Sequence, residues 1–312
     1  MAPAELGDHF GRDQALELPL VLTKERAQGA VYIVTGSNTG LGYEAAKHLV
    51  QLSCAKVILA VRNQTKGDET LARLEAETGV KGIAEAWPLE MGVYDSIKAF
   101  ADRVKGLERL DGIVENAAVA LANWSVSDGL ETTLIVNVTG TMLLAGLVMP
   151  KLKESAKKFG ILPHISIIGS GVAFTVPGVL EGIEGDFIES LNNESNGIKD
   201  RYELLYRRLQ RLIVLTNTRR YQVSKLLLFY AVREYALRNP VSATGVVVNY
   251  VNPGLCVTEL DRHVPEQLQA QINSLRDAHG RTAEMGSRTL IHGAVGGVET
   301  HGKYVSECEI KE

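Results

Sequence analysis

Short apolar runs, rich in β-branched residues, alternate along the chain with longer segments whose apolar residues recur at helical spacing. Strands that are apolar almost throughout are typical of a sheet that helices cover on both faces. Their alternation with helices indicates βαβ units and a parallel sheet. Seven runs are predicted to be strands: residues 30–35, 56–61, 83–89, 110–115, 161–168, 244–250 and 303–306.

Helical patterns fill the intervals between these runs. The predicted helices are residues 41–52, 66–78, 94–105, a long helix that includes Asn137 and a helix that begins at Tyr221. The most apolar segment, residues 134–149, contains the polar Thr139 and Thr141 and ends at Pro150. We therefore expect a buried or interface helix there and no transmembrane segment.

One long interruption, residues 174–220, separates the fifth predicted strand from the helix of Tyr221. It contains Pro177, several glycines and a helical segment at 198–215. A loop of this length in a compact domain is usually functional, so we interpret it as a helical lid over the substrate site, with a solvated surface insertion as the alternative. No composition shift marks a second domain. We expect an N-terminal extension at residues 1–28 and one domain over 29–312.

Composition removes several classes of function. Hydrophobic residues make up 45% and charged residues 22% of the 312-residue chain, as in an ordinary soluble protein. The 33 basic and 37 acidic residues give a net charge of −4, which offers no argument for nucleic acid or an anionic membrane. Seven scattered histidines and three distant cysteines indicate neither a metal site nor a disulfide framework. With no secretory signal visible, we expect a cytoplasmic protein.

The first predicted strand runs into the glycine-rich sequence T-G-S-N-T-G-L-G, which opens a helix. Glycines there permit a tight turn and a close approach of backbone to a pyrophosphate at the helix N-terminus. The strand–turn–helix context predicts a dinucleotide site. Its candidate residues are Gly36, Asn38, Thr39, Gly40, Leu41 and Gly42.

The end of the second predicted strand indicates which dinucleotide is preferred. Sites for NAD usually carry an acidic residue there, whereas this chain has Val61 followed by Arg62. A guanidinium suits a 2′-phosphate, and Lys66 adds positive charge nearby. We therefore predict NADP(H) as the cofactor, with a merely solvated Arg62 as the alternative.

The spacing Tyr-x-x-x-Lys, which places both side chains on one face of a helix, occurs three times. The pairs are Tyr43 with Lys47, Tyr94 with Lys98, and Tyr221 with Lys225. The first follows the glycine turn and the second follows the third strand. Only Tyr221 opens a helix after the fifth strand, which leads to Ser170. We therefore predict that only this pair faces a nicotinamide.

These motifs, in this order, resemble the short-chain dehydrogenase/reductase family from about residue 29 onward. The motifs are the glycine turn, Glu115-Asn116-Ala117-Ala118, Asn137, Ser170, Tyr221 with Lys225, and Pro253-Gly254 with Thr258. The stretch V-I-L-A-V-R-N and the long insertion resemble the retinol dehydrogenase-like and carbonyl reductase-like branches. The ending H-G-K-Y-V-S resembles fungal members found among secondary-metabolism enzymes.

The resemblance implies a single-domain α/β Rossmann fold with a doubly wound, seven-stranded parallel sheet. It also implies a catalytic tetrad of Asn137, Ser170, Tyr221 and Lys225. Lys225 is expected to lower the pKa of Tyr221, because a neighbouring ammonium favours the phenolate, and to bond the nicotinamide ribose. Ser170 would donate to the substrate oxygen, Tyr221 would deliver a proton, and Asn137 would hold a water that links Lys225 to solvent.

The remaining family positions are expected around the cofactor. They are Glu90 near the adenine, Asn116 with Ala117 at the adenosine side, Pro253 and Gly254 after the sixth strand, and Thr258 at the nicotinamide carboxamide or the pyrophosphate. Three positions depart from the family pattern: alanine at 118, glycine at 169 and glutamate in place of aspartate at 90. Ser166 is a possible rival to Ser170, but its apolar surroundings predict a core residue.

The resemblance implies an NADPH-dependent reductase of a ketone or aldehyde in a mostly apolar small molecule. One alternative is an NADP-dependent alcohol dehydrogenase that works in the oxidative direction. Another is an NADP-binding member with lost or repurposed chemistry. A monomer or a homodimer fits the sequence. Arg219 or Arg220 is expected either on a solvated helix face or against an acidic group of the substrate.

Overall fold

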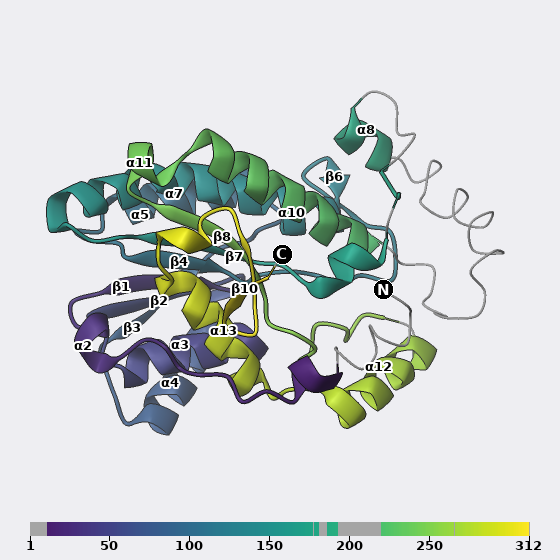
Figure 1. Cartoon of the computed structure of the whole chain (residues 1–312), viewed down its shortest axis with the longest axis horizontal. Helices are drawn as coiled ribbons and strands as arrows, with labels where there is room; N and C mark the ends of the chain where they lie inside the picture. Colours follow the sequence, from purple (N-terminus) through teal and green to yellow (C-terminus); the bar gives the residue numbers. More distant parts are fainter. Residues whose placement is uncertain (1–10, 177, 181–185, 193–219, 265, 312) are drawn as a thin grey trace.

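A computed structural model of the chain describes residues 11–176, 178–180, 186–192, 220–264 and 266–311 (Figure 1). Its centre is an eight-stranded sheet of order β10-β9-β8-β7-β4-β1-β2-β3. The strands are β1 (Val31–Thr35), β2 (Lys56–Val61), β3 (Ala84–Pro88), β4 (Gly112–Glu115), β7 (His164–Ile168), β8 (Val247–Asn252), β9 (Tyr304–Ser306) and β10 (Glu309–Lys311). This is the predicted α/β Rossmann architecture.

The prediction of a wholly parallel, seven-stranded sheet needs one correction. Strands β1 to β9 of this sheet pair in parallel, whereas β10 is an eighth strand that pairs antiparallel to β9. A tight turn at Glu307 and Cys308, both with positive φ, connects the two strands. Because β10 is a short, mostly exposed edge strand, it has no apolar run that marks it in the sequence.

Helices cover both faces of the sheet, as Figure 1 shows. On one face lie α5 (Tyr94–Lys105), α7 (Gly140–Phe159) and α10 (Arg220–Arg238), and on the other lie α3 (Gly40–Gln51), α4 (Gln64–Thr78) and α13 (Ala283–Val295). Adjacent residues of β1 therefore belong to different cores: Ile33 packs with the first set and Val34 with the second. Burial on both faces explains the nearly continuous apolar strands.

The remaining described elements are short, apart from one helix. They are α2 (Lys24–Ala27), β5 (Val126–Ser127), β6 (Leu130–Glu131), α6 (Thr132–Leu134), η1 (Ile135–Thr139), η2 (Gly171–Thr175), α8 (Phe187–Leu191), α11 (Val241–Thr244), α12 (Glu266–His279) and η3 (Val298–Thr300). The sixth strand, predicted at 244–250, is β8 and begins later than predicted. The helix α11 occupies residue 244, and Gly245 caps it with a φ of 67°, in the left-handed region.

The apolar segment around Asn137 is a core helix. Thr132–Phe159 forms one helical stretch, and it is the one stretch in the described part of the chain that is long and apolar enough to cross a membrane. The share of its most apolar window that is buried inside the protein is 67%. Packing against the sheet and α5 accounts for that composition, as expected from the sequence.

The chain before β1 is packed against the domain over the part that the structure describes. Leu18 and Leu22 are each 2% exposed, and Arg288 of α13 donates a hydrogen bond to the carbonyl of Leu18 at 2.7 Å. In Figure 1 this segment runs along the face formed by α3 and α13. Most of the expected lid, including the helix predicted at 198–215, lies outside the described residues.

Candidate active site

A cavity of about 1690 Å³ lies at the carboxyl ends of the parallel strands, where ligands bind in open α/β sheets. It extends from the glycine turn after β1 to the loop after β8. Most of the residues predicted for the site contribute to its wall. They are Gly36, Asn38, Thr39, Gly40, Leu41, Arg62, Glu90, Asn116, Ala117, Ser170, Tyr221, Lys225, Pro253, Gly254 and Thr258. The two predicted residues that do not line it are Gly42 and Asn137.

The glycine turn brings two stretches of backbone close together and leaves the start of α3 without a side-chain cap. Gly36 and Gly40 have φ angles of 63° and 58°, in the left-handed region that favours glycine. A Cβ on Gly42 would lie 2.5 Å from Nδ2 of Asn116 and 2.6 Å from the carbonyl oxygen of Gly36. The Thr39 side chain makes no capping hydrogen bond at the start of α3. The N-terminal amides of α3 therefore fit an anionic group.

Residues after β4 hold this turn in place. Nδ2 of Asn116 donates to the carbonyls of Thr35 at 3.0 Å and Gly36 at 3.2 Å. The Ala117 amide donates to Oγ1 of Thr35 at 2.9 Å. Asn116 thus joins two neighbouring strand ends, in addition to lining the cavity where the adenosine side was expected.

Basic groups stand at the rim next to β2. The Arg62 side chain is 73% exposed, and its Nε lies 3.6 Å from a carboxylate oxygen of Glu90. Lys66 is also exposed and pairs with Glu69 at 3.1 Å. Such exposed ion pairs contribute little to stability, so the guanidinium of Arg62 can exchange its partner for another anion.

Tyr221 and Lys225 come together on α10, as their spacing predicts. Nζ of Lys225 lies 5.7 Å from the centre of the Tyr221 ring and donates to the carbonyl of Ile168 at 2.7 Å. Lys225 is 3% exposed, and burial lowers its pKa to about 7. Its charge therefore depends on pH near neutrality.

The expected lowering of the tyrosine pKa is not found in this structure. Burial raises the pKa of Tyr221 to about 12, and the Ser170 hydroxyl opposes this rise only in part. The reason is desolvation, which disfavours the charged form of both side chains. It disfavours the tyrosinate directly, and it also disfavours the lysine ammonium that would stabilise the tyrosinate. The tyrosine is thus a protonated phenol across the physiological range.

Asn137 is a buried side chain that does not line the cavity. It is 1% exposed and lies in η1, a π-helical turn of the kind often found at functional sites. Its amide accepts from the Val119 N–H at 2.9 Å and donates to the Val119 carbonyl at 2.9 Å and to Oγ of Ser224 at 3.0 Å. The side chain therefore fixes the segment after β4 against α10, and its contacts are with protein groups.

Tyr250 of β8 supports the backbone of the site from behind the cavity wall, a role that the sequence analysis missed. Its hydroxyl accepts from the Ser170 N–H at 3.0 Å and lies 3.1 Å from the carbonyl of Lys225. A Cβ on Gly169 would lie 1.8 Å from Cζ of Tyr250, so glycine at 169 makes room for this phenol. Two features of the sequence could have indicated this contact: a tyrosine within an apolar strand, and a glycine immediately before the serine.

The rival residues occupy structural positions. The Arg73 guanidinium lies 3.6 Å from the centre of the Tyr43 ring, and the Tyr94 hydroxyl lies 2.9 Å from Oγ1 of Thr139. Neither tyrosine lines the cavity. Ser166 is 0% exposed, which confirms the expectation of a core residue.

Arg220 is engaged within the protein. Its Nη2 donates to the carbonyl of Ala122 at 2.9 Å, and its Nε lies 3.5 Å from the buried Glu131. It does not line the cavity, so the structure gives no support for a contact between Arg220 and an acidic substrate group. Arg219 lies outside the described residues. In the part of the chain that is described, no cluster of three or more histidine, cysteine, aspartate or glutamate residues could hold a metal ion.

Sequence comparisons identify relatives of the whole chain. The family model described as short chain dehydrogenase matches residues 30–175. The chain is 37% identical over 285 residues to the short chain dehydrogenase/reductase dmxR8 of Cryptosporiopsis sp. (strain 8999), over 90% of this chain and 82% of that protein. It is 34% identical over 282 residues to the short chain dehydrogenase atnD of Emericella nidulans, over 89% of this chain and 84% of that protein.

Solved structures share the fold at lower identity. A short-chain dehydrogenase from Sphingobium yanoikuyae in complex with NADPH has a TM-score of 0.59 and 19% identity, over 89% of this chain and 87% of that one. Salutaridine reductase from Papaver somniferum has a TM-score of 0.62 and 21% identity, over 88% and 99% of the two chains. These structures show the fold, and the sequence relatives show that the chain belongs to the short-chain dehydrogenase/reductase family, a family of oxidoreductases.

Proposed function

We propose that the protein is an NADPH-dependent reductase of a ketone or aldehyde in a mostly apolar small molecule. One observation carries this proposal: a single cavity joins the glycine turn and α3 N-terminus at one end to Ser170, Tyr221 and Lys225 at the other. An anion-binding turn and a proton donor in one cavity are what a reductase of this kind requires. The oxidative direction would use the same groups in reverse.

In the proposed reaction, the residues of the cavity have separate roles. A bound dihydronicotinamide would supply the hydride, and the glycine turn with Pro253, Gly254 and Thr258 would hold that cofactor. The Ser170 hydroxyl would donate to the carbonyl oxygen of the substrate. Tyr221, protonated because its pKa is raised to about 12, would then transfer its proton to that oxygen. Lys225 in its charged form would stabilise the tyrosinate that remains.

The preference for NADPH rests on the end of β2. Val61 and Arg62 stand where an acidic residue would accept the ribose hydroxyls of NADH, and both line the cavity. The exposed guanidinium is free to exchange Glu90 for a 2′-phosphate, which it would bind through two parallel hydrogen bonds. Lys66 would add charge at the same rim.

The substrate end of the cavity supports an apolar molecule of medium size. Its wall combines apolar residues of η2 with those of α12 and the segment before it. These residues are Val172, Phe174, Leu260, Leu268, Ile272 and Leu275. The fungal relatives and this lining together support a secondary metabolite as the substrate class.

The replacement Tyr221→Phe tests the proposal in an assay that follows NADPH absorbance against a panel of carbonyl substrates. Loss of the proton donor should lower kcat/KM by roughly 10²–10⁴-fold while NADPH binding persists. The control is Tyr230→Phe, since Tyr230 lies on the same helix but is 52% exposed. The unchanged protein should use NADPH more efficiently than NADH. Turnover that survives Tyr221→Phe would favour repurposed chemistry instead.

A further inference from the structure

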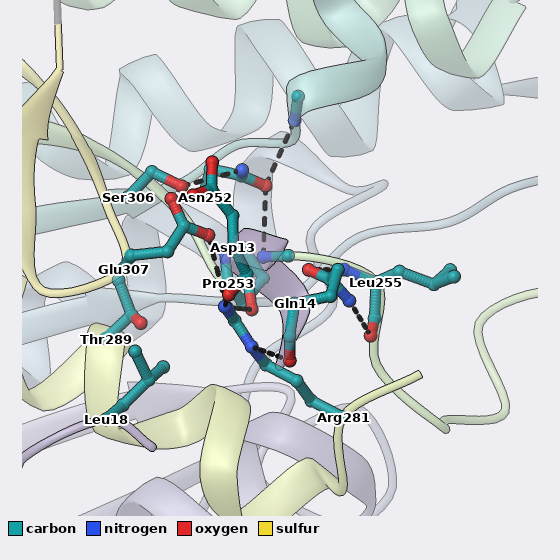
Figure 2. Close-up of polar contacts among 12 residues, drawn as sticks. Asp13, Gln14, Leu18, Asn252, Pro253, Leu255, Arg281, Thr289, Ser306 and Glu307 are labelled. Carbon is teal, nitrogen blue, oxygen red and sulfur yellow. Dashed lines mark hydrogen bonds and ion pairs between the residues drawn. The ribbon is translucent and has the colours of Figure 1, made fainter. Parts of the chain in front are cut away.

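We propose that residues 11–22, expected from the sequence to lie outside the catalytic domain, form an N-terminal clamp on the 253–258 loop. Gln14 of the clamp and Arg281, which lies just before α13, would be positioning residues for the nicotinamide end of the cofactor site. This inference rests on the proposed function, because the 253–258 loop supplies Pro253, Gly254 and Thr258 to that site. Figure 2 shows the contacts involved.

Gln14 pairs with the loop as a neighbouring strand would. Its Nε2 donates to the Leu255 carbonyl at 2.8 Å, and its Oε1 accepts from the Leu255 N–H at 3.1 Å (Figure 2). Nε2 also donates to the carbonyl of His279 at 3.1 Å. Gln14 is only 6% exposed, so these bonds are shielded from water. One side chain thus satisfies both backbone groups of Leu255.

Arg281 ties three distant segments together. Its guanidinium donates to the carbonyls of Asp13 and Pro253, and its Nε donates to the carbonyl of Gln14 at 3.2 Å. Its Nη1 also lies 3.2 Å from Glu307, in the turn between β9 and β10. Arg281 is 4% exposed, and a buried guanidinium holds its position through such a complete set of partners.

The loop approaches the clamp more closely than a side chain would allow. Gly254 has a φ of 80°, and a Cβ there would lie 2.3 Å from Oε1 of Gln14 and 2.8 Å from Nη1 of Arg281. On its other side, the loop is joined to the catalytic wall through Asn252. Oδ1 of Asn252 accepts from the amides of Gly254 at 3.2 Å and Gly171 at 3.0 Å, next to Ser170.

The clamp is anchored independently of the cofactor. Leu18 is buried against α13, where its N–H contacts the sulfur of Met285 at 3.2 Å and its carbonyl accepts from Arg288. Asp13 and Gln14 also line the same cavity as Ser170 and Tyr221. A loop held in this way before binding spends more time in the binding-competent state, which raises the apparent affinity.

The replacements Gln14→Ala and Arg281→Lys test the clamp. Each should raise the Kd and the KM for NADPH about tenfold, as expected for the loss of one or two buried hydrogen bonds, and leave kcat at saturating NADPH within about twofold. Hydrogen exchange of the amides of the 253–258 loop, measured without cofactor, should be faster in both variants. The double variant should weaken NADPH binding by less than the product of the two single effects, because both residues act on one loop.

The matched control is Glu17→Ala, since Glu17 lies in the same segment with an exposed side chain. All variants are compared at a temperature at which circular dichroism shows them fully folded. A merely structural role would lower the thermal midpoint but leave Kd, KM and loop exchange unchanged, which would overturn the clamp. If Arg281→Lys does not fold, Gln14→Ala alone decides. Failure of the unchanged protein to bind NADPH would instead refute the proposed function.

Discussion

At the scale of single residues, Tyr250 and Gly169 depend on each other. The Tyr250 ring fills the space in which a side chain at 169 would stand, and its hydroxyl contacts the backbones of Ser170 and Lys225. The Tyr250 side chain of β8 thus connects the segment after β7 with α10. A side chain at 169, as in the family pattern of paired serines, would overlap the Tyr250 ring.

The replacement Gly169→Ser should therefore destabilise the protein by about 3 kcal/mol, because Cβ would overlap the fully buried Tyr250 ring. Denaturant unfolding followed by circular dichroism measures this change. The double replacement Gly169→Ser with Tyr250→Val should cost less than the sum of the two single replacements, because the overlap disappears when the ring is removed. Gly171→Ser serves as the control, since the nearest atom to a Cβ there is 3.3 Å away. Equal losses at the two glycines would contradict the steric explanation.

At the scale of elements, the π-helical turn η1 sets how α10 meets the segment after β4. Asn137 projects from this turn and bonds both the N–H and the carbonyl of Val119, as well as Ser224 of α10. The element that follows β4 and the helix that carries Tyr221 are thereby held by one buried amide.

The replacement Asn137→Ala should lower the free energy of unfolding by about 2 kcal/mol, because two backbone groups of Val119 lose their partner. Chemical denaturation provides the measurement. Asn239→Ala is a suitable comparison, because among the described residues its side-chain amide bonds only the carbonyl of Tyr235, near the end of α10. A loss no larger than that of the control would show that η1 does not depend on its asparagine.

The sequence predicted elements well where periodicity and burial agree. The sequence predicted seven strands from apolar runs, and it predicted the long helices α3, α4, α5, α7 and α10 from helical spacing. It predicted neither α12 nor α13, which lie between β8 and β9. It did not predict β10, which is too short and exposed to show a pattern, nor the helix α11 at 241–244. The contacts of Gln14 and Tyr250 were also inaccessible, because they join residues 241 and 80 positions apart in the chain. Tertiary packing, not local pattern, creates such pairs.

At the scale of the whole molecule, a buried acid makes stability depend on pH. Glu115, the last residue of β4, is 3% exposed, and neither of its carboxylate oxygens has a hydrogen-bond partner among the described residues. Burial raises its pKa well above 4.5, so the folded protein holds this proton more tightly than the unfolded chain. The contribution of protonated Glu115 to the free energy of unfolding is fully present below pH 4.5, and it is lost as pH rises through the folded-state pKa.

The replacement Glu115→Gln should remove this dependence. Relative to the unchanged protein, the variant should gain up to about 1.4 kcal/mol of unfolding free energy per pH unit above the ordinary pKa of glutamate. Unfolding curves at several pH values measure this difference. His164 and Lys225 have lowered pKa values, so each favours the folded state as pH rises. Both residues are present in the variant and in the unchanged protein, so their effects cancel in the difference between the two. A difference that stays constant with pH would contradict the buried acid.

The contacts of Arg281 determine when this part of the protein can fold during synthesis. Its guanidinium meets Asp13 and Gln14, and also Glu307 near the last strand. During synthesis on the ribosome, this corner therefore stays open until Glu307 has emerged, and shorter nascent chains expose the unfinished wall. Late closure of this kind leaves partly made chains prone to aggregation and dependent on chaperones.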